Sequence, residues 1–207
     1  MSVRSSVLER LRANERETKK SLIMDVFIAL AEEEKSFARI SLGEIANAVG
    51  ISTTTIYQYF QNKDDLLVET FLRELHNIDE YITEKLESEK NPSVQSVIWG
   101  SIDYLLDHES SHQVLNYFML QGNMTPEIMD RIAKMPLSFL DVVSDAFADA
   151  GLYKGKRFIS HIFLSVVLGG LMAFKSFGYG TADEIRSHLP ELTQFAIHSF
   201  FGGRNAK

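Results

Sequence analysis

Residues 41–63 read SLGEIANAVGISTTTIYQYFQNK, and this stretch decides the fold of the N-terminal part of the chain. Its spacing predicts a helix-turn-helix, in which two short helices cross steeply and the second can enter the DNA major groove. Ala46 is expected at the crossing, where only a small side chain lets the helices approach. Gly50, four residues on, falls where the connecting turn requires a positive φ, which glycine adopts without steric cost.

The residues around this turn support the same prediction. Ser41 and Ser52 each stand where a hydroxyl can cap the N-terminus of one of the two helices. The apolar residues expected to pack between the helices are Ile45, Val49, Ile51 and Ile56.

The same stretch resembles the DNA-binding end of the tetracycline-repressor (TetR) family of bacterial regulators. The most specific part is a hydrophobic-Tyr-x-x-Phe segment followed by x-Lys-x-x-Leu, which runs here from Ile56 to Leu66. The resemblance covers roughly residues 16–75 and is carried by the runs IA at 45–46, GIS at 50–52, IYQYF at 56–60 and NKDDLL at 62–67. It implies a DNA-binding domain over residues 1–62 and an effector-binding and dimerisation domain over residues 63–207.

Helical periodicity extends over nearly the whole chain. The four prolines fall at breaks, and no strand-like alternation bounded by turn residues appears, so the pattern predicts an all-α fold of about nine helices. The first is expected from about Glu17 and the third over residues 53–60. The fourth is expected to be long, capped by Asn62 and ending near Glu87. The others are expected at about 42–49, 92–108, 114–120, 136–150, 154–177 and 182–201, with a short helix after Pro126.

The charge is distributed unevenly. The whole chain carries −7, but residues 1–63 hold nine basic and eight acidic residues, and residues 64–207 hold twelve and twenty. The N-terminal part is therefore the end that can approach phosphate. Two readings stay open for the basic arm at residues 1–16, which holds Arg4, Arg10, Arg12 and Arg16: it enters the minor groove, or it is a solvated tail.

Composition restricts the cellular setting. The chain has no cysteine and therefore no disulfide framework, and its N-terminus has no apolar signal-peptide core, so a cytoplasmic protein is expected. Residues 158–174 form an apolar run that is short for a bilayer crossing, and a buried helix is the expected structure. No cofactor and no metal ion are expected.

The first turn of the second helix is expected to face the bases. Thr53, Thr54 and Thr55 offer hydroxyls to base edges and methyl groups to thymine. The resemblance implies that Gln58 contacts adenine and that Lys63 binds phosphate. It also implies phosphate or sugar contacts for Tyr57 and Tyr59, although either ring can instead pack on the first helix. Ser41 is a further candidate for a phosphate contact.

The C-terminal half suggests pairing and a ligand. Its last two helices are apolar on more than one face, which implies a second copy, since a helix-turn-helix normally reads two half-sites. The expected dimer interface comprises Phe163, Val167, Gly170, Leu171, Phe174, Leu192, Phe195, Ala196, Ser199 and Phe200. The resemblance implies a pocket for a small apolar effector, for which the best lining candidates are Trp99, Phe118, Met119 and Phe139.

These features favour a homodimeric repressor that a small apolar effector releases from a palindromic operator. One alternative is a DNA-binding dimer that is controlled by a protein partner or by no ligand. A remote alternative is a zinc hydrolase, because residues 108–112 match H-E-x-x-H. That chemistry requires His108 and His112 on one helix face, whereas the serines between them suggest the start of a new helix.

Overall fold

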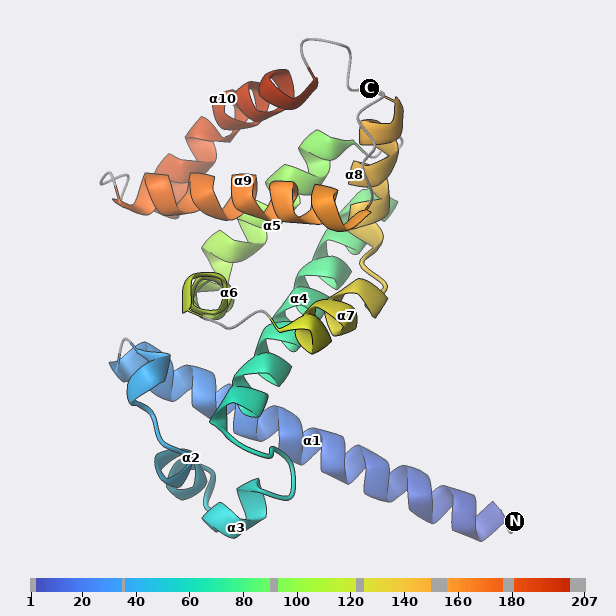
Figure 1. Cartoon of the computed structure of the whole chain (residues 1–207), viewed down its shortest axis with the longest axis vertical. Helices are drawn as coiled ribbons and strands as arrows, with labels where there is room; N and C mark the ends of the chain where they lie inside the picture. Colours follow the sequence, from blue (N-terminus) through green and yellow to red (C-terminus); the bar gives the residue numbers. More distant parts are fainter. Residues whose placement is uncertain are drawn as a thin grey trace. The chain divides into compact units, whose positions relative to one another are not determined.

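The computed structural model describes residues 3–34, 36–89, 93–121, 125–149, 156–176 and 181–201 (Figure 1). These residues form ten α-helices and one 3-10 helix and contain no strand, which confirms the all-α prediction. The elements are α1 (Val3–Glu34), η1 (Phe37–Arg39), α2 (Leu42–Val49), α3 (Thr53–Ile56), α4 (Lys63–Glu87), α5 (Val94–Asp107), α6 (Glu109–Gln121), α7 (Pro126–Lys134), α8 (Ser138–Asp149), α9 (Lys156–Ser176) and α10 (Ala182–Phe201).

The chain divides into two compact units. The first comprises residues 1–71 and 117–122, and the second comprises residues 72–116 and 123–207. Both α4 and α6 contribute residues to each unit. Packing thus divides the chain within α4, and the functional boundary after residue 62 stays a prediction.

The first unit is built on α1. Phe27 of α1, Ile45 of α2 and Ile56 of α3 are completely buried. The rings of Phe27 and Phe37 meet edge to face with centroids 5.2 Å apart. Each such side chain contributes about 1.5–3 kcal/mol on burial, so this small core holds the two short helices in place.

Two helix boundaries in this unit differ from the sequence prediction. α1 begins at Val3 and not at about Glu17, since residues 3–16 contain good helix formers and neither glycine nor proline. α3 ends at Ile56 and not at residue 60, because the chain tightens into 3-10 turns: the N–H of Gln58 donates to the Thr55 carbonyl at 3.1 Å, and that of Tyr59 to the Ile56 carbonyl at 2.9 Å.

The second unit is organised around α5, which packs against α8, α9 and α10. The side chains of Val97, Val143 and Leu171 are among those fully or almost fully buried there. The N-terminus of α8 is held by α4, since the Asp79 carboxylate accepts the Phe139 N–H at 3.2 Å. Among the described residues, no helix is both long enough and apolar enough to cross a membrane.

Candidate nucleic-acid interface

The side chain of a serine fixes the start of each helix of the α2–α3 pair. The Ser41 hydroxyl accepts the Glu44 N–H at 3.2 Å, and the Glu44 carboxylate accepts the Ser41 N–H at 2.7 Å, which completes a capping box. Hydrogen bonds from Ser41 hold the pKa of the Glu44 carboxyl below its usual value. At α3, the Ser52 hydroxyl accepts the Thr55 N–H at 3.1 Å. Both predicted caps are confirmed.

The turn between the helices has the predicted geometry. Gly50 adopts φ 78° and ψ 31°, the left-handed conformation that disfavours other residues. The next N–H, that of Ile51, donates to the Ala46 carbonyl at 2.9 Å and closes the turn. Ala46 is only 2% exposed, which confirms its place inside the helix pair. Val49 and Ile51 are half-buried at the edge of the same contact.

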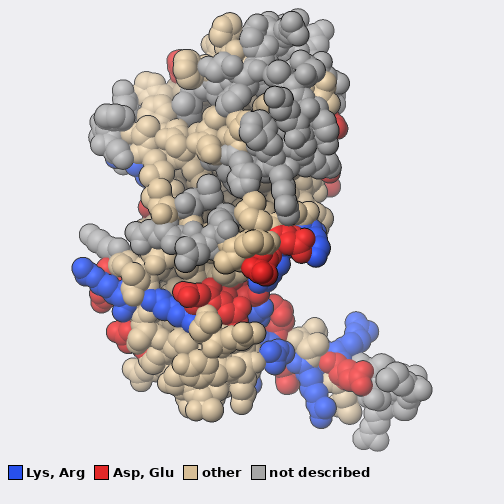
Figure 2. Space-filling model, in the orientation of Figure 1, with Lys and Arg blue, Asp and Glu red and all other residues tan. Residues whose placement is uncertain are grey.

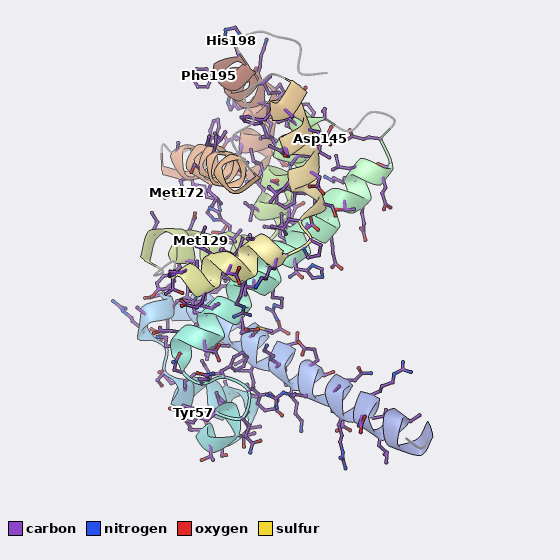
Figure 3. The ribbon with its side chains drawn as sticks, turned by 45° about the vertical axis from the view of Figure 1, so that its right-hand side comes forward. Tyr57, Met129, Asp145, Met172, Phe195 and His198 are labelled. Carbon is purple, nitrogen blue, oxygen red and sulfur yellow. The ribbon has the colours of Figure 1, made fainter. Side chains whose placement is uncertain are left out.

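A hydroxyl-rich and amide-bearing edge of α3 faces solvent. Thr53, Thr54 and Gln58 are exposed, and the Tyr57 side chain, which is 57% exposed, lies at the surface beside α3 (Figure 3). On the face shown in Figure 2, the atoms over α2 and α3 belong mostly to uncharged residues, while both basic and acidic side chains lie along α1. This edge therefore offers hydrogen bonds and methyl groups rather than charge.

Thr55 and Tyr59, both predicted contact residues, are partly engaged within the protein. The Thr55 hydroxyl lies 2.8 Å from the Ser52 hydroxyl and belongs to the α3 cap. Tyr59 is half-buried, and the guanidinium carbon of Arg16 lies 5.4 Å from the centre of its ring. Of the two tyrosines, Tyr59 therefore contacts α1, whereas Tyr57 remains exposed.

Lys63 stands at the first position of α4. The Asn62 side chain accepts the Asp65 N–H at 2.8 Å, so the predicted cap of this helix is confirmed. The Lys63 ammonium donates to the Ala38 carbonyl in η1 at 2.8 Å. Burial lowers the pKa of Lys63, against the opposing effect of Asp64 and Glu44. The sequence did not indicate this carbonyl partner, because η1 was not predicted.

The comparison with known families identifies this part of the chain. The sequence model of one protein family, described as "Bacterial regulatory proteins, tetR family", matches residues 32–70. These residues include α2, α3 and the start of α4. Over residues 32–70, this chain is similar to the TetR family. The match explains why the sequence motif, the two caps and the left-handed glycine occur together.

Two curated proteins show the same relationship over the N-terminal half. An HTH-type transcriptional regulator of Staphylococcus aureus (strain MRSA252) is 33% identical over 92 residues, which are 44% of this chain and 48% of that protein. The transposon Tn10 TetC protein of Escherichia coli is 28% identical over 99 residues, 47% of this chain and 49% of that protein. The match thus spans about half the length of these relatives.

Solved structures extend the likeness of fold to most of this chain. A TetR-family transcription regulator of Marinobacter aquaeolei has a TM-score of 0.64 and 19% identity, covering 89% of this chain and 97% of that one. FadR of Bacillus subtilis, solved in complex with stearoyl-CoA, has a TM-score of 0.64 and 16% identity, covering 86% and 97%. At 19% and 16% identity, the likeness to these structures shows a shared fold and nothing further.

The structure describes the side chains of three of the four expected ligand-lining residues. Phe118 is buried in the first unit, where its ring stacks on Phe71 with centroids 4.0 Å apart. Phe139 is buried in the second unit at the start of α8. The side chain of Met119 lies outside the described residues. Phe118 and Phe139 are buried, so Trp99 is the one of these three described side chains that is exposed, and the ligand contacts stay a prediction.

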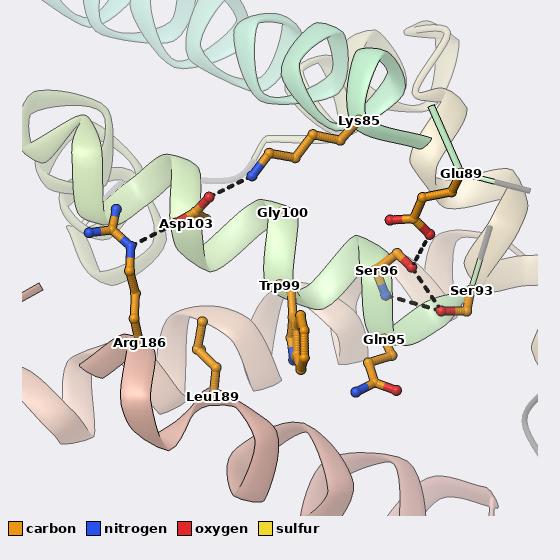
Figure 4. Close-up of a pocket in the computed structure, with 10 residues that line it drawn as sticks. All are labelled: Lys85, Glu89, Ser93, Gln95, Ser96, Trp99, Gly100, Asp103, Arg186 and Leu189. Atoms are coloured by element: carbon orange, nitrogen blue, oxygen red, sulfur yellow. Dashed lines mark hydrogen bonds and ion pairs between the residues drawn. The ribbon is translucent and has the colours of Figure 1, made fainter. Parts of the chain in front are cut away.

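Trp99 lines a groove of about 540 Å³ between α4, α5 and α10 (Figure 4). Its indole N–H donates to the Thr193 hydroxyl at 2.7 Å, which fixes the ring on α10. At one end of the groove, Asp103 accepts hydrogen bonds from Lys85 at 2.5 Å and from Arg186 at 2.8 Å. Burial opposes ionisation of Asp103, but these cations hold its pKa below the usual value.

This ion network was not predicted from the sequence. Asp103 and Asp107 stand four residues apart on α5, and both accept hydrogen bonds from Arg186. The spacing places them on one helix face, but only the packing of α10 shows which cation they meet. The network ties α10 to α5 and, through Lys85, to α4.

The expected dimer residues fall into three groups. Val167 and Leu171 are already buried inside one copy, so they have no surface left for a partner. Gly170 and Phe174 are half-buried, whereas Phe195 is 72% exposed and projects from α10 (Figure 3). The remaining five, whose side chains lie outside the described residues, are Phe163, Leu192, Ala196, Ser199 and Phe200.

The two histidines of the H-E-x-x-H match lie on either side of a helix break. His108 follows the last residue of α5 and stacks on Tyr104 with ring centroids 4.1 Å apart, while α6 begins at Glu109. His112 is buried in α6, with its Nε2 atom 2.7 Å from the Asn116 side-chain nitrogen. Within the described part of the chain, no three metal-ligating side chains are grouped to hold an ion.

Proposed function

We propose that this protein is a homodimeric transcriptional repressor that binds a palindromic operator and is released from it by a small apolar effector. The observation that carries the proposal is the capped α2–α3 pair with an exposed edge of hydroxyl and amide side chains. Its relatives include a protein described as a transcriptional regulator. A helix-turn-helix protein uses this edge to read base pairs in the major groove.

The exposed edge suits recognition of bases rather than general attraction to DNA. Thr53 and Thr54 can exchange hydrogen bonds with base edges and touch thymine methyl groups. Gln58 can form the paired hydrogen bonds that adenine accepts and donates. Phosphate contacts then come from around this edge, where Ser41, Tyr57, Tyr59 and Lys63 are the proposed donors.

The effector is proposed to be an apolar molecule of the acyl type. This proposal is supported by the fold likeness to FadR of Bacillus subtilis, whose structure contains stearoyl-CoA. α4 contributes residues to both units, so a ligand-dependent shift of this helix would reach the DNA-reading edge through the chain itself. The effector must bind the two arrangements with different affinity, and a coupling of about 1–3 kcal/mol is typical.

The test is a comparison of specific and non-specific binding. An operator is selected from random duplex DNA, and dissociation constants are measured on it and on a scrambled duplex. Thr54→Ala and Gln58→Ala are expected to cost about 1–3 kcal/mol on the operator and little on the scrambled duplex, because each removes a base contact. Gln194→Ala, at an exposed position of α10, is the control and should change neither. Equal losses on both duplexes would refute the assignment of base contacts.

A further inference from the structure

Two basic residues of α1 face the turn that follows α3. The Arg16 guanidinium donates to the carbonyl oxygen of Gln58 at 2.9 Å, and its central carbon lies 5.4 Å from the centre of the Tyr59 ring. One helical turn later, the Lys20 ammonium lies 5.7 Å from the centre of the Phe60 ring. The segment from Gln58 to Phe60 is therefore held against α1 at two successive turns.

The backbone carbonyls of this segment need hydrogen-bond donors from elsewhere in the protein. α3 has only four residues and is followed by 3-10 turns, so the carbonyls at its end lack the partners that a longer helix would supply. A guanidinium suits the position, since it can donate to a carbonyl and lie on a ring at once, and its charge is favourable at a helix C-terminus. The hydrogen bond fixes the backbone of Gln58, from which a proposed base-reading side chain extends.

Arg16 and Lys20 differ in the other contacts that their charged groups make. Lys20 also pairs with Glu69 of α4, with 2.5 Å between the ammonium nitrogen and the carboxylate oxygen. Its charge is thus neutralised within the first unit. Among the described residues, the contacts of Arg16 are with the segment after α3, which makes Arg16 the residue whose removal should act most directly on that segment.

We propose that Arg16 is a positioning residue for DNA reading. It holds the backbone of Gln58 and the ring of Tyr59 so that the side chains of this segment are preset for the major groove. The inference rests on the proposed function for its biological meaning, while the contact between α1 and the segment does not depend on DNA. Arg16 lies within α1, thirteen residues after the helix begins at Val3, so the helix holds its backbone in a fixed position beside the segment.

The competing explanation is that Arg16 is a phosphate contact. Arginine and lysine carry the same charge, so a phosphate contact would be largely preserved in Arg16→Lys. A positioning role would be lost in Arg16→Lys, because an ammonium cannot donate to the Gln58 carbonyl while lying flat on the Tyr59 ring. Arg16→Lys therefore separates the two explanations, and Arg16→Gln removes both contacts.

The first measurement uses the free full-length protein. Hydrogen exchange of the amides of residues 57–60 is expected to rise about fivefold in Arg16→Gln and also to rise in Arg16→Lys, since a net hydrogen bond of ordinary strength is lost. Arg12→Gln removes an exposed arginine one turn earlier on α1 and is the matched control, for which no change is expected. Unchanged exchange in Arg16→Gln would overturn the proposal.

The second measurement is the affinity for the selected operator and for scrambled DNA over a range of salt concentrations. Both Arg16 variants are expected to bind the operator about tenfold more weakly, with a lower ratio of specific to non-specific affinity and a melting temperature at most about 2–4 °C below that of the wild-type protein. Wild-type affinity in Arg16→Lys, together with a salt slope lowered by about one unit in Arg16→Gln, would show a phosphate contact and overturn the proposal. If the wild-type protein prefers no DNA sequence, the proposed function fails, and the exchange result still decides whether Arg16 holds the segment.

Discussion

Lys63 shows how one side chain combines structural and proposed binding roles. The sequence suggested a phosphate-binding lysine at the start of α4, and the structure places its ammonium on the Ala38 carbonyl at 2.8 Å. An ammonium has three donors, so two remain for phosphate after this bond is made. The bond also restricts the long side chain, which reduces the entropy lost when phosphate is bound.

Lys63→Ala is expected to lower affinity for every DNA sequence to a similar degree. The salt slope of log affinity should become shallower by about one unit, because one fewer counterion is released from the DNA. Titrations by fluorescence anisotropy at several salt concentrations measure both effects. A slope equal to that of the wild-type protein would mean that Lys63 serves only to hold η1.

At the scale of single residues, the sequence correctly predicted the features that depend on near neighbours in the chain. Ser41, Ser52, Asn62 and Gly50 were assigned correctly, because a cap or a left-handed turn is decided by neighbours within four residues. The carbonyl partner of Lys63 lies 25 residues away and that of Arg16 lies 42 residues away. Contacts of this kind depend on tertiary packing, which no local pattern specifies.

At the scale of helices, the long periodic elements were predicted best. α4, α5 and α10 lie close to their expected bounds, since an apolar stripe sustained over several turns identifies a helix reliably. The errors are at the ends of α1 and α3, where intrinsic helix propensity and local 3-10 tightening decide the boundary. α6 begins at Glu109, about five residues before its expected range, but the break that the serines suggested is present and separates His108 from His112.

The contact between α4 and α8 gives a prediction about pH. Burial raises the pKa of Asp79, although the N–H groups of Phe139 and Ser138 partly oppose the shift. Because the folded-state pKa lies above the unfolded value, the folded protein prefers the protonated acid. The stability gained from this preference is fully present below the unfolded value of about 4 and is lost as pH rises through the folded pKa.

Asp79→Asn keeps an oxygen that accepts the Phe139 N–H and removes the charge. The variant is therefore expected to be more stable than the wild-type protein at pH 7, with a gain that shrinks as pH falls toward 4. Urea unfolding at several pH values between 4 and 8 measures the difference. A variant that is less stable at pH 7 would indicate that the ionised carboxylate is the better cap.

At the scale of the whole molecule, the charge distribution and the family match agree on which end of the chain is proposed to bind DNA. Residues 64–207 hold twenty acidic and twelve basic residues and repel phosphate, while the N-terminal part carries the exposed reading edge. The sequence predicted the helix-turn-helix that carries this edge and its resemblance to the TetR family. It did not identify a ligand site, because the aromatic residues of an all-α core look alike in sequence whether they fill the core or line a pocket.

In the proposed complex, two copies place their α3 edges in successive major grooves of one operator. Chemical footprinting of the selected operator, combined with the mass of the complex in solution, tests this most directly. Binding of this kind should give two protected major-groove segments related by two-fold symmetry, with centres about 10–10.5 base pairs apart or slightly more. It should also give two protein chains on each duplex. A single protected segment bound by one chain, or protection confined to the minor groove, would contradict it.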